Sequence, residues 1–257
     1  MPATVAELME SVTADDVVTS AFWLHNTTRL AGADVTYRNH YAVVRLGTSF
    51  GACAFEDGQL DPDVCASISG RTVTDLLRTA PLPVRVAVLD AQLAERAPHR
   101  ESAADHVYLP VGTPEERAAA RDEAIAGLLG EEKRVGLIGV VNPLVAAIEA
   151  RGGECLPCDL NLRETAWGKA VTPDMHEVLD VADAIVATGM TLSNGSFDTI
   201  LRRCREREIP LVIYAQTGSA VAREFLGSGV TALCAEPFPF SQFSAELTTV
   251  YCYRSET

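Results

Sequence analysis

The sequence predicts an α/β protein in which a small α+β domain precedes a Rossmann-like domain with a doubly wound parallel sheet. After about Arg134, short apolar runs alternate with helical segments through short connections, the pattern of repeated β-α-β units. One of these runs, Val135–Val140, is apolar throughout, as expected for a strand covered on both faces. The residues before about 97 instead mix strands with paired helices. We therefore expect a small α+β domain at 1–97, a linker at 98–112 and the Rossmann-like α/β domain at 113–257.

The composition excludes several classes of protein. The net charge of −14 over 257 residues would repel a phosphate backbone, so we expect no nucleic-acid partner. No apolar stretch approaches the roughly 20 residues that cross a bilayer, and no secretory signal is visible, so we expect a cytoplasmic protein without a membrane partner. The seven cysteines, an odd number, indicate free thiols. A homodimer is left open.

The first domain is expected to open with an amphipathic helix, because apolar residues from Val5 to Val12 fall at helical spacing. Thr72 with Asp75 forms a capping box for a later helix, which Pro81 ends. The expected elements are a helix at 3–12, strands at 16–24, 41–46 and 51–55, a helix between 72 and 81, and a helix at 84–96.

The second domain is expected to begin after an aperiodic stretch at 97–109. Thr113, Pro114 and the acids that follow them provide an N-cap, a proline at the first helical position and an acidic first turn. In the helix 196–207, Asp198 lies in the first turn and arginines lie near the end, which suits the helix dipole. The expected elements are helices at 113–129, 142–151, 196–207 and 220–226, a further helix that begins at Thr172 and Pro173, and strands at 135–140, 154–158, 184–187, 210–214 and 231–234.

Ligands of doubly wound sheets bind beyond the carboxyl ends of the strands, and three loops of this sequence reach that edge. The first contains Gly139 and Asn142 but lacks the G-x-G-x-x-G pattern, so an ordinary NAD site is not expected. The second contains Asp159, with Asn161 beside it, about 20 residues after Gly139. An acid at this place commonly accepts hydrogen bonds from ribose hydroxyls, although it also suits a simple turn.

The third loop, Thr188–Ser196, is the most informative segment. Hydroxyl and amide side chains and two glycines run directly into the start of a helix. One interpretation is a ligand-facing loop, and the other is an Asx turn with an N-cap. Gln216 follows the next strand and would hold the other side of the same ligand. The candidate binding residues are Gly139, Asn142, Asp159, Thr188, Thr191, Asn194, Gly195, Ser196 and Gln216.

Two acids are candidates for catalysis or for binding an amine. Asp90 lies in an otherwise apolar helix, and Glu236 precedes the aromatic segment Pro237–Phe240. A carboxylate in an apolar helix usually faces solvent, and we weigh this against a contact with the ligand across the cleft.

No metal ligands are assigned. Cys155 and Cys158 have a metal-like spacing, but they fall on an expected strand without a second pair, so we interpret them as small buried side chains. The five histidines are dispersed. His25 and His40 fall at the ends of strands in the first domain, from where either could reach an interdomain cleft.

These residues resemble a known family. The stretch Thr188-Gly-x-Thr-Leu-x-Asn-Gly-Ser-x-Asp198 is similar to the hallmark segment of a Rossmann-like family named for heavy-metal chelation, and Ser69–Leu76 matches its partner domain. The resemblance implies an enolase-N-terminal-like fold for the front domain and a ligand site between the domains. The chain departs from the family at Asp90, where Asn is usual, and at Glu236–Phe240.

Two functions remain open. The preferred hypothesis is a biosynthetic enzyme of specialised metabolism that uses S-adenosylmethionine, as a transferase or a lyase or cyclase. Asp159 would hold the ribose, the loop containing Thr191, Asn194 and Ser196 would bind the carboxylate, and Asp90 or Glu236 would contact the ammonium or act as acid or base. The alternative is a non-catalytic protein that binds a heavy metal or a metal chelate.

Overall fold

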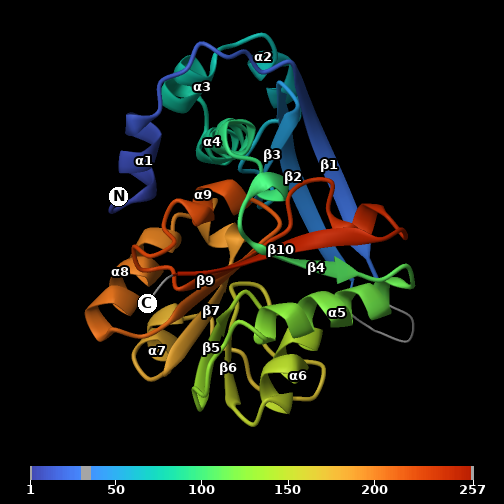
Figure 1. Cartoon of the computed structure of the whole chain (residues 1–257), viewed down its shortest axis with the longest axis vertical. Helices are drawn as coiled ribbons and strands as arrows, with labels where there is room; N and C mark the ends of the chain where they lie inside the picture. The colour runs from blue at the N-terminus through green and yellow to red at the C-terminus, as the bar shows by residue number, and fades with distance from the viewer. Residues whose placement is uncertain (1, 30–35, 256–257) are drawn as a thin grey trace.

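The computed structural model describes residues 2–29 and 36–255, and it has the expected α/β architecture. A front unit with a small antiparallel sheet lies at the top of Figure 1, and a larger, mostly parallel sheet with its helices lies below it. None of the helices in these residues has the length and apolar character needed to span a bilayer.

The front unit is a three-stranded antiparallel sheet packed on one long helix, α4. The close approach depends on Gly51, because a Cβ there would lie 2.1 Å from the Ala91 nitrogen. Thr72 caps α3, which ends at Thr79 just before Pro81, and α4 begins directly after this proline rather than at Val84. The short α2 was not predicted. The elements are α1 (Val5–Ser11), β1 (Ser20–Thr28), β2 (Tyr37–Leu46), β3 (Ser49–Phe55), α2 (Val64–Ile68), α3 (Val73–Thr79) and α4 (Leu82–Arg96).

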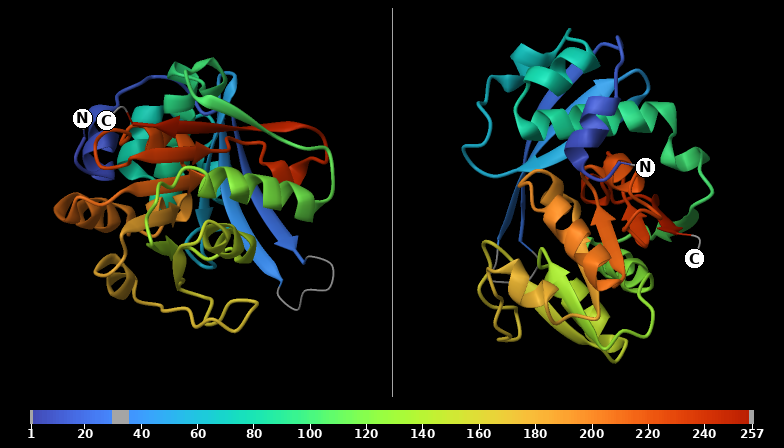
Figure 2. Two further views of the ribbon diagram at one scale, coloured as in Figure 1. Left: turned by 60° about the horizontal axis from the view of Figure 1, so that its bottom comes forward. Right: turned by 90° about the vertical axis from the view of Figure 1, so that its left-hand side faces the viewer.

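Strand β1 lies later in the chain than the sequence indicated and strand β2 is longer, and both differences matter for the site. The predicted strand 16–24 in fact begins at Ser20 and continues to Thr28, and β2 begins at Tyr37 rather than Tyr41. The paired strands therefore extend as a hairpin from the front unit along the side of the larger unit (Figure 2). The extra length is polar, so it carries no apolar alternation from which a strand could be predicted.

The larger sheet has seven strands in the order β4-β10-β9-β8-β7-β5-β6. Five of them, in the order β6-β5-β7-β8-β9, are parallel, which is the 2-1-3-4-5 order of doubly wound folds. After β5 the chain adds β6 on one side of it and then β7 on its other side, so the switch point lies between β5 and β7. The strands are β4 (Asp105–Leu109), β5 (Arg134–Ile138), β6 (Glu154–Cys158), β7 (Ala184–Thr188), β8 (Leu211–Ala215), β9 (Ala232–Ala235) and β10 (Thr248–Arg254).

The linker predicted at 98–112 is partly wrong. It contains the 3₁₀ turn η1 (His99–Glu101) and β4, which pairs with β10 at the edge of the large sheet. Most of β4 faces solvent, so its sequence shows no burial pattern. The C-terminal segment packs on the large sheet by supplying β10, which pairs with β9.

Helices cover both faces of the large sheet. One face packs on α5 and α6, and the other packs on α7, α8 and α9 and on the front unit. The expected N-cap of α5 is present, and it is part of a capping box in which the Thr113 and Glu116 side chains each bond the other residue's backbone. The helices are α5 (Pro114–Ala126), α6 (Asn142–Ala150), α7 (Met175–Leu179), α8 (Phe197–Arg207) and α9 (Ser219–Arg223), with 3₁₀ turns η2 (Gly189–Leu192) and η3 (Ser241–Phe243).

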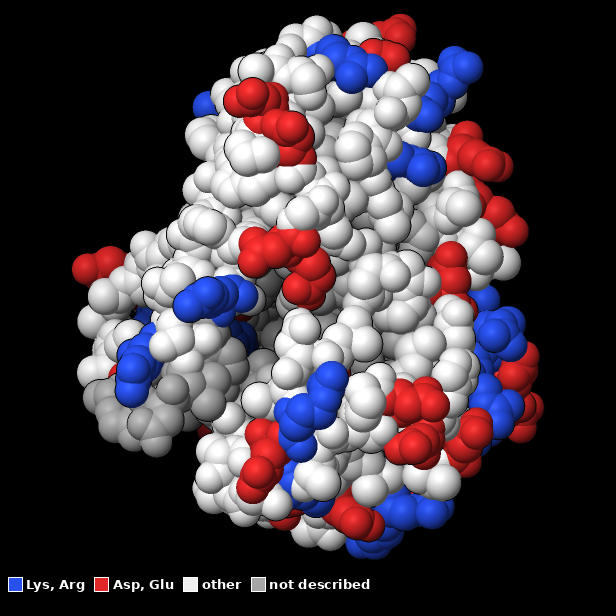
Figure 3. Space-filling view, turned by 180° about the vertical axis from the view of Figure 1, so that it is seen from behind, with Lys and Arg blue, Asp and Glu red and all other residues white. Residues whose placement is uncertain are grey.

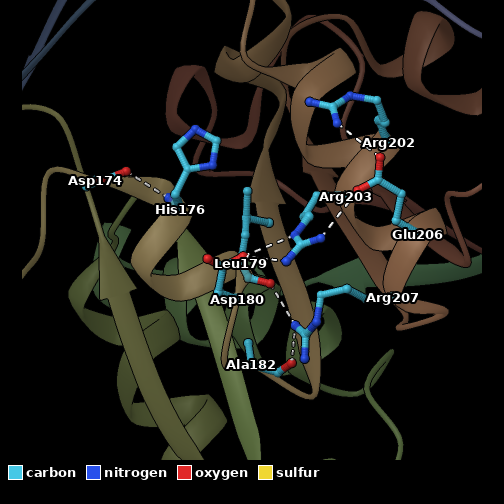
Figure 4. Close-up of polar contacts among 9 residues, drawn as sticks. All are labelled: Asp174, His176, Leu179, Asp180, Ala182, Arg202, Arg203, Glu206 and Arg207. Atoms are coloured by element: carbon cyan, nitrogen blue, oxygen red, sulfur yellow. Dashed lines mark hydrogen bonds and ion pairs between the residues drawn. The ribbon is translucent and has the colours of Figure 1, made fainter.

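The arginines of α8 do more than complement its dipole. Figure 4 shows Arg203 between Asp180 and Glu206, with its Nη2 2.7 Å from the Asp180 carboxylate. Arg207 donates to the carbonyl oxygens of Leu179 and Ala182, at 2.7 and 2.8 Å. The carbonyl oxygens at and just after the end of α7 have no N–H partner within that helix, and Arg207 supplies one. This contact holds α7 and α8 together.

Candidate functional site

A cavity of about 930 Å³ lies between the β1–β2 hairpin and the carboxyl edge of the parallel strands. This volume is at the upper end of the range for small-molecule sites. Seen from behind, the surface is hollowed between the two units, with acidic and basic side chains near the opening (Figure 3). The walls come from the hairpin, from the ends of five parallel strands, from one face of α5 and from residues 241–245.

The floor of the cavity is the switch point between β5 and β7. Gly139 has φ of +89°, and a Cβ there would lie 2.4 Å from the Thr188 side chain, so only glycine fits. The Tyr214 hydroxyl donates to the Gly139 carbonyl at 2.6 Å, and burial raises the pKa of this tyrosine well above its usual value. Gly139 and Thr188, both predicted from the sequence, therefore lie together on the floor.

Asp159 lines the cavity at the end of β6, where the sequence placed it. Its Oδ2 accepts from the Val140 nitrogen at 2.9 Å, and its Oδ1 accepts from the Asn161 and Leu162 nitrogens at 2.8 and 3.0 Å. Three backbone donors fix the carboxylate in place. It joins the two loops on either side of it and still presents an edge to the cavity.

Glu236 and Gln216 are brought together on the opposite wall. Glu236 is 4% exposed, and its Oε2 accepts from Gln216 Nε2 at 2.8 Å. Its Oε1 accepts from the backbone nitrogen of Ser241. Gln242 bonds Gln216 and reaches the Tyr41 hydroxyl, which belongs to the front unit. Burial, and then the nearby Glu236 charge, raise the pKa of Tyr41 to about 12. A polar network thus spans the two units across the cavity.

Arg121 lies in this wall and was not predicted. It occupies the cavity-facing side of α5, and its Nε donates to Asp122 at 3.0 Å. Burial lowers the pKa of Arg121, but the charges of Asp122 and Glu236 outweigh it and raise that pKa above its usual value. Within the described residues, only Nε is engaged in a hydrogen bond. The fork of Nη1 and Nη2 is therefore left for a ligand, and it suits a carboxylate.

Arg117, one turn earlier on the same face of α5, has a structural role. Its guanidinium donates to the carbonyl oxygens of Pro110, Glu246 and Ser241 and to the Thr248 hydroxyl. These contacts fix the 241–248 segment that closes one end of the cavity. Pro114, Arg117, Arg121 and Ile125 recur at helical spacing, so one face of α5 forms this wall, but charged residues at this spacing do not by themselves distinguish a cavity-facing side from a solvent-facing one.

The loop Thr188–Ser196 contributes less to the cavity than its polarity indicated. Thr188 and Met190 line it, but Thr191, Asn194, Gly195 and Ser196 are not among its lining residues. Thr191 is 1% exposed and donates to the Thr188 carbonyl, and Asn194 Oδ1 accepts from the Ser196 nitrogen and hydroxyl at 3.0 and 2.6 Å. This is the geometry of the turn that we weighed as the alternative.

Asn142 also points elsewhere. It begins α6, and its Oδ1 accepts from the Ala166 nitrogen at 2.9 Å, which anchors the long loop between β6 and α7. Its neighbours Val141 and Pro143 line the cavity instead.

Asp90 joins the two units at a point that does not line the cavity. It is 4% exposed, and its carboxylate accepts from the backbone nitrogens of Ala52, in β3, and Ala220, in α9. Burial raises the pKa of Asp90 to about 6, against the effect of these hydrogen bonds. The expected solvent-facing position is wrong, because α4 is enclosed on all sides along this turn. The contact with ligand expected for Asp90 has no support in this position.

Cys155 and Cys158 lie on opposite faces of the sheet. Cys155 packs with the helices α5 and α6, whereas Cys158 packs with the core on the other side. Side chains three positions apart on a strand point in opposite directions, so the pair does not converge on one ion. Burial raises the pKa of Cys155 to about 12 and that of Cys158 to about 11. The interpretation as buried thiols is therefore correct.

The sequence from residue 125 to residue 235 matches the model of DUF364, a family described as "putative heavy-metal chelation". The resemblance to this family is confirmed. The matched segment runs from the end of α5 through β9 and includes Gly139, Asp159, Thr188 and Gln216. The front unit and the aromatic segment lie outside it. No curated protein matches the chain.

Two solved structures of DUF364 proteins have the same fold along the whole chain. The protein of Desulfitobacterium hafniense DCB-2 is 13% identical, with a TM-score of 0.66 over 98% of this chain and 96% of that one. The protein of Pyrococcus horikoshii is 18% identical, with a TM-score of 0.60 over 97% of this chain and 96% of that one. Both are described as proteins of unknown function. Both structures therefore share the front unit as well as the parallel sheet with this chain.

Proposed function

We propose that the cavity binds a metabolite that joins a nucleoside to an amino acid, with S-adenosylmethionine as the preferred candidate, and that the protein transforms it. The observation that carries this proposal is the distribution of charge over the lining: a fixed carboxylate, Asp159, at the end of β6, and an arginine fork, Arg121, on the wall formed by α5. A cavity of about 930 Å³ has room for a ligand of this size.

The nucleoside half of the ligand is assigned to the end of β6. An acid that follows the second strand of a doubly wound sheet accepts hydrogen bonds from ribose hydroxyls, and Asp159 is held for this by three backbone N–H groups. Val140, Val141, Pro143 and Leu162 provide apolar lining next to it for a base.

The amino-acid half is assigned to the wall formed by α5 and the end of β9. The unused fork of Arg121 would receive the carboxylate in a bidentate contact. Glu236 and the amide oxygens around it would receive the ammonium. The candidate roles of Glu236 and Gln216 are therefore kept, and the carboxylate contact moves from Asn194 to Arg121.

The reaction class follows from the ligand. A nucleophile attacks a carbon bonded to the sulfonium, a new bond forms, and the sulfur leaves with the electron pair as a neutral thioether. The nucleophile belongs either to a second substrate, in a transferase, or to the same molecule, in a cyclase. Because the leaving group is already activated, holding the two reacting atoms in line supplies most of the acceleration. In this step Glu236, as the alternative to its contact with the ammonium, would take up the proton of the nucleophile.

Calorimetric titration tests the proposal. Wild-type protein is titrated with S-adenosylmethionine, with its demethylated and nucleoside products, and with methionine alone, and each mixture is then incubated and separated by chromatography with mass detection. We expect binding of the intact ligand to be tighter than binding of either half. Absence of binding by all of them would contradict the proposal.

A second candidate function is binding of a heavy metal or metal chelate without catalysis, which the description of DUF364 favours. The elemental content of protein purified without added metal tests it. A stoichiometric metal together with no binding of S-adenosylmethionine would establish this alternative in place of the first.

A further inference from the structure

His25, His40 and Asp57 form a cluster that no part of the cavity uses. Atoms able to bind a metal, one from each of the three side chains, all lie within 4.8 Å of one another. His25 and His40 are directly opposite in the β1–β2 pairing, with their ring centroids 3.7 Å apart. His40 Nδ1 lies 3.0 Å from the Asp57 carboxylate.

We propose that these three residues form a binding site for a divalent first-row transition metal on the β1–β2 hairpin. In a tetrahedral site with ligand bonds of about 2.0–2.1 Å, neighbouring ligand atoms are about 3.4 Å apart. His40 Nδ1 and the Asp57 carboxylate, 3.0 Å apart, lie close to this spacing and need only a small separation to reach it. A rotamer adjustment of His25, whose side chain is exposed, brings in the third ligand.

The type of ligand selects the ion. Two imidazoles and one carboxylate suit Zn²⁺, Co²⁺, Ni²⁺ or Cu²⁺, whereas Mg²⁺ and Ca²⁺ prefer oxygen alone. Three protein ligands leave at least one coordination position open. Since the Asp57 side chain is 91% exposed, that position faces solvent and is available to water or to a small chelating molecule.

One ligand of the cluster is held in place by packing, and the other two are exposed. The His40 side chain is 11% exposed and packs on Phe55, with a centroid distance of 5.6 Å, so its ring is held in place. His25 and Asp57 remain at the surface and can adjust to the ion.

The position of the site connects it to the cavity. Successive side chains of a strand face opposite sides, so Asn26 and Asn39, the next pair along the hairpin, point away from the two histidines. Both asparagines line the cavity. A metal held by His25 and His40 would cross-link β1 and β2 next to the residue pair that forms the cavity wall. Occupancy of the site is therefore expected to make this wall more rigid.

Titration with Co²⁺, followed by its visible absorption, tests the site on the full chain after treatment with a chelator and its removal. We expect one Co²⁺ per chain, displaced by Zn²⁺, and at least tenfold weaker binding in His25→Ala, His40→Ala and Asp57→Asn. His106→Ala is the matched control, because His106 is an exposed histidine on another strand, β4, and we expect it to bind as the wild type does.

Thermal unfolding separates loss of the site from loss of the fold. We expect Zn²⁺ to raise the melting temperature of the wild type and of His106→Ala but not that of His25→Ala, with all three equal in the presence of chelator. Equal Co²⁺ affinity in wild type and His25→Ala, or an equal loss in His106→Ala, would overturn the proposal. The outcome is independent of the cavity: titration of His25→Ala with S-adenosylmethionine reports on the proposed function separately.

Discussion

The carboxylate of Asp90 accepts a hydrogen bond of 2.8 Å from the backbone nitrogen of Ala220, and this contact joins the front unit to the first turn of α9. The other carboxylate oxygen accepts from Ala52 in β3 at 3.0 Å. One side chain of α4 thus ties together three elements from both units. Because the cavity lies between the same two units, Asp90 affects the site through their relative position rather than by contact with a ligand.

Replacement of Asp90 by Asn is expected to destabilise the fold. The amide keeps one acceptor, but its NH₂ group would face the second backbone donor and leave that donor buried without a partner, which costs about 1–3 kcal/mol. Chemical denaturation at neutral pH measures the change. Asp180→Asn is a suitable control, since Asp180 is an exposed carboxylate with an arginine partner and its loss should cost less than about 1 kcal/mol. An Asp90 variant as stable as this control would contradict the role.

The stability contributed by Asp90 is expected to depend on pH. Its pKa is raised from 3.8 to about 6 in the folded state, mainly by burial, so the folded protein holds the proton more tightly than the unfolded chain does. The part of the contribution that comes from proton binding is therefore full below about pH 4 and is lost as the pH rises through about 6, whereas the part that comes from the two backbone hydrogen bonds of the carboxylate remains at neutral pH. The difference in free energy of unfolding between the wild type and Asp90→Asn should fall between about pH 4 and about pH 6 and stay constant above pH 7. An unchanged difference across this window would argue against the raised pKa.

Arg121→Gln is expected to weaken the binding of S-adenosylmethionine. Loss of a charge-assisted contact with a carboxylate costs about 1.5–3 kcal/mol, or about 10- to 100-fold in affinity. Binding of a nucleoside product without the amino-acid portion should be unchanged. Titration of both ligands on both proteins gives the comparison, and Arg202→Gln, an exposed arginine of α8 outside the cavity, serves as the control. Equal losses for the two ligands would show that Arg121 maintains the wall instead of binding the carboxylate.

Asp159→Asn is expected to reduce the affinity for adenosine about tenfold and to leave that for adenine unaltered. The amide can still accept hydrogen bonds on one side, but it cannot offer two charged oxygens to ribose hydroxyls. Titration with the nucleoside and the free base on each protein checks this. Parallel changes for both ligands would indicate that the substitution displaces the loop through its bonds to Val140 and Leu162.

The sequence predicted the parallel sheet well because its signals are local. An apolar run such as Val135–Val140 and a cap such as Thr113 each indicate the secondary structure of the segment in which they lie. The structure has β5 and α5 at these two places. Strand β4 was missed for the same reason. Its residues are mostly exposed, and it is held by pairing with β10, which lies more than 130 residues later.

Within the site, residues at strand ends could be predicted, whereas residues on helices could not. Asp159, Thr188 and Gln216 follow strands, and every parallel strand ends at the same edge of the sheet. Arg121 belongs to α5, and its position depends on which face of that helix packs on the sheet edge. In an alanine-rich segment with many charges, the half-buried Arg121 and the buried Asp122 are indistinguishable from solvent-exposed neighbours.

Asn194→Ala tests the remaining interpretation of the loop Thr188–Ser196. Because Asn194 Oδ1 closes a turn onto Ser196, its loss should destabilise the fold by about 0.5–2 kcal/mol, as for a lost cap, without changing the affinity for S-adenosylmethionine. Thermal unfolding and titration are measured on the same preparation. A drop in affinity of tenfold or more at unchanged stability would restore Asn194 as a ligand-binding residue and move the carboxylate contact away from Arg121. The Arg121→Gln result would then show no selectivity between ligands with and without a carboxylate, so the two variants together decide where the amino-acid portion lies.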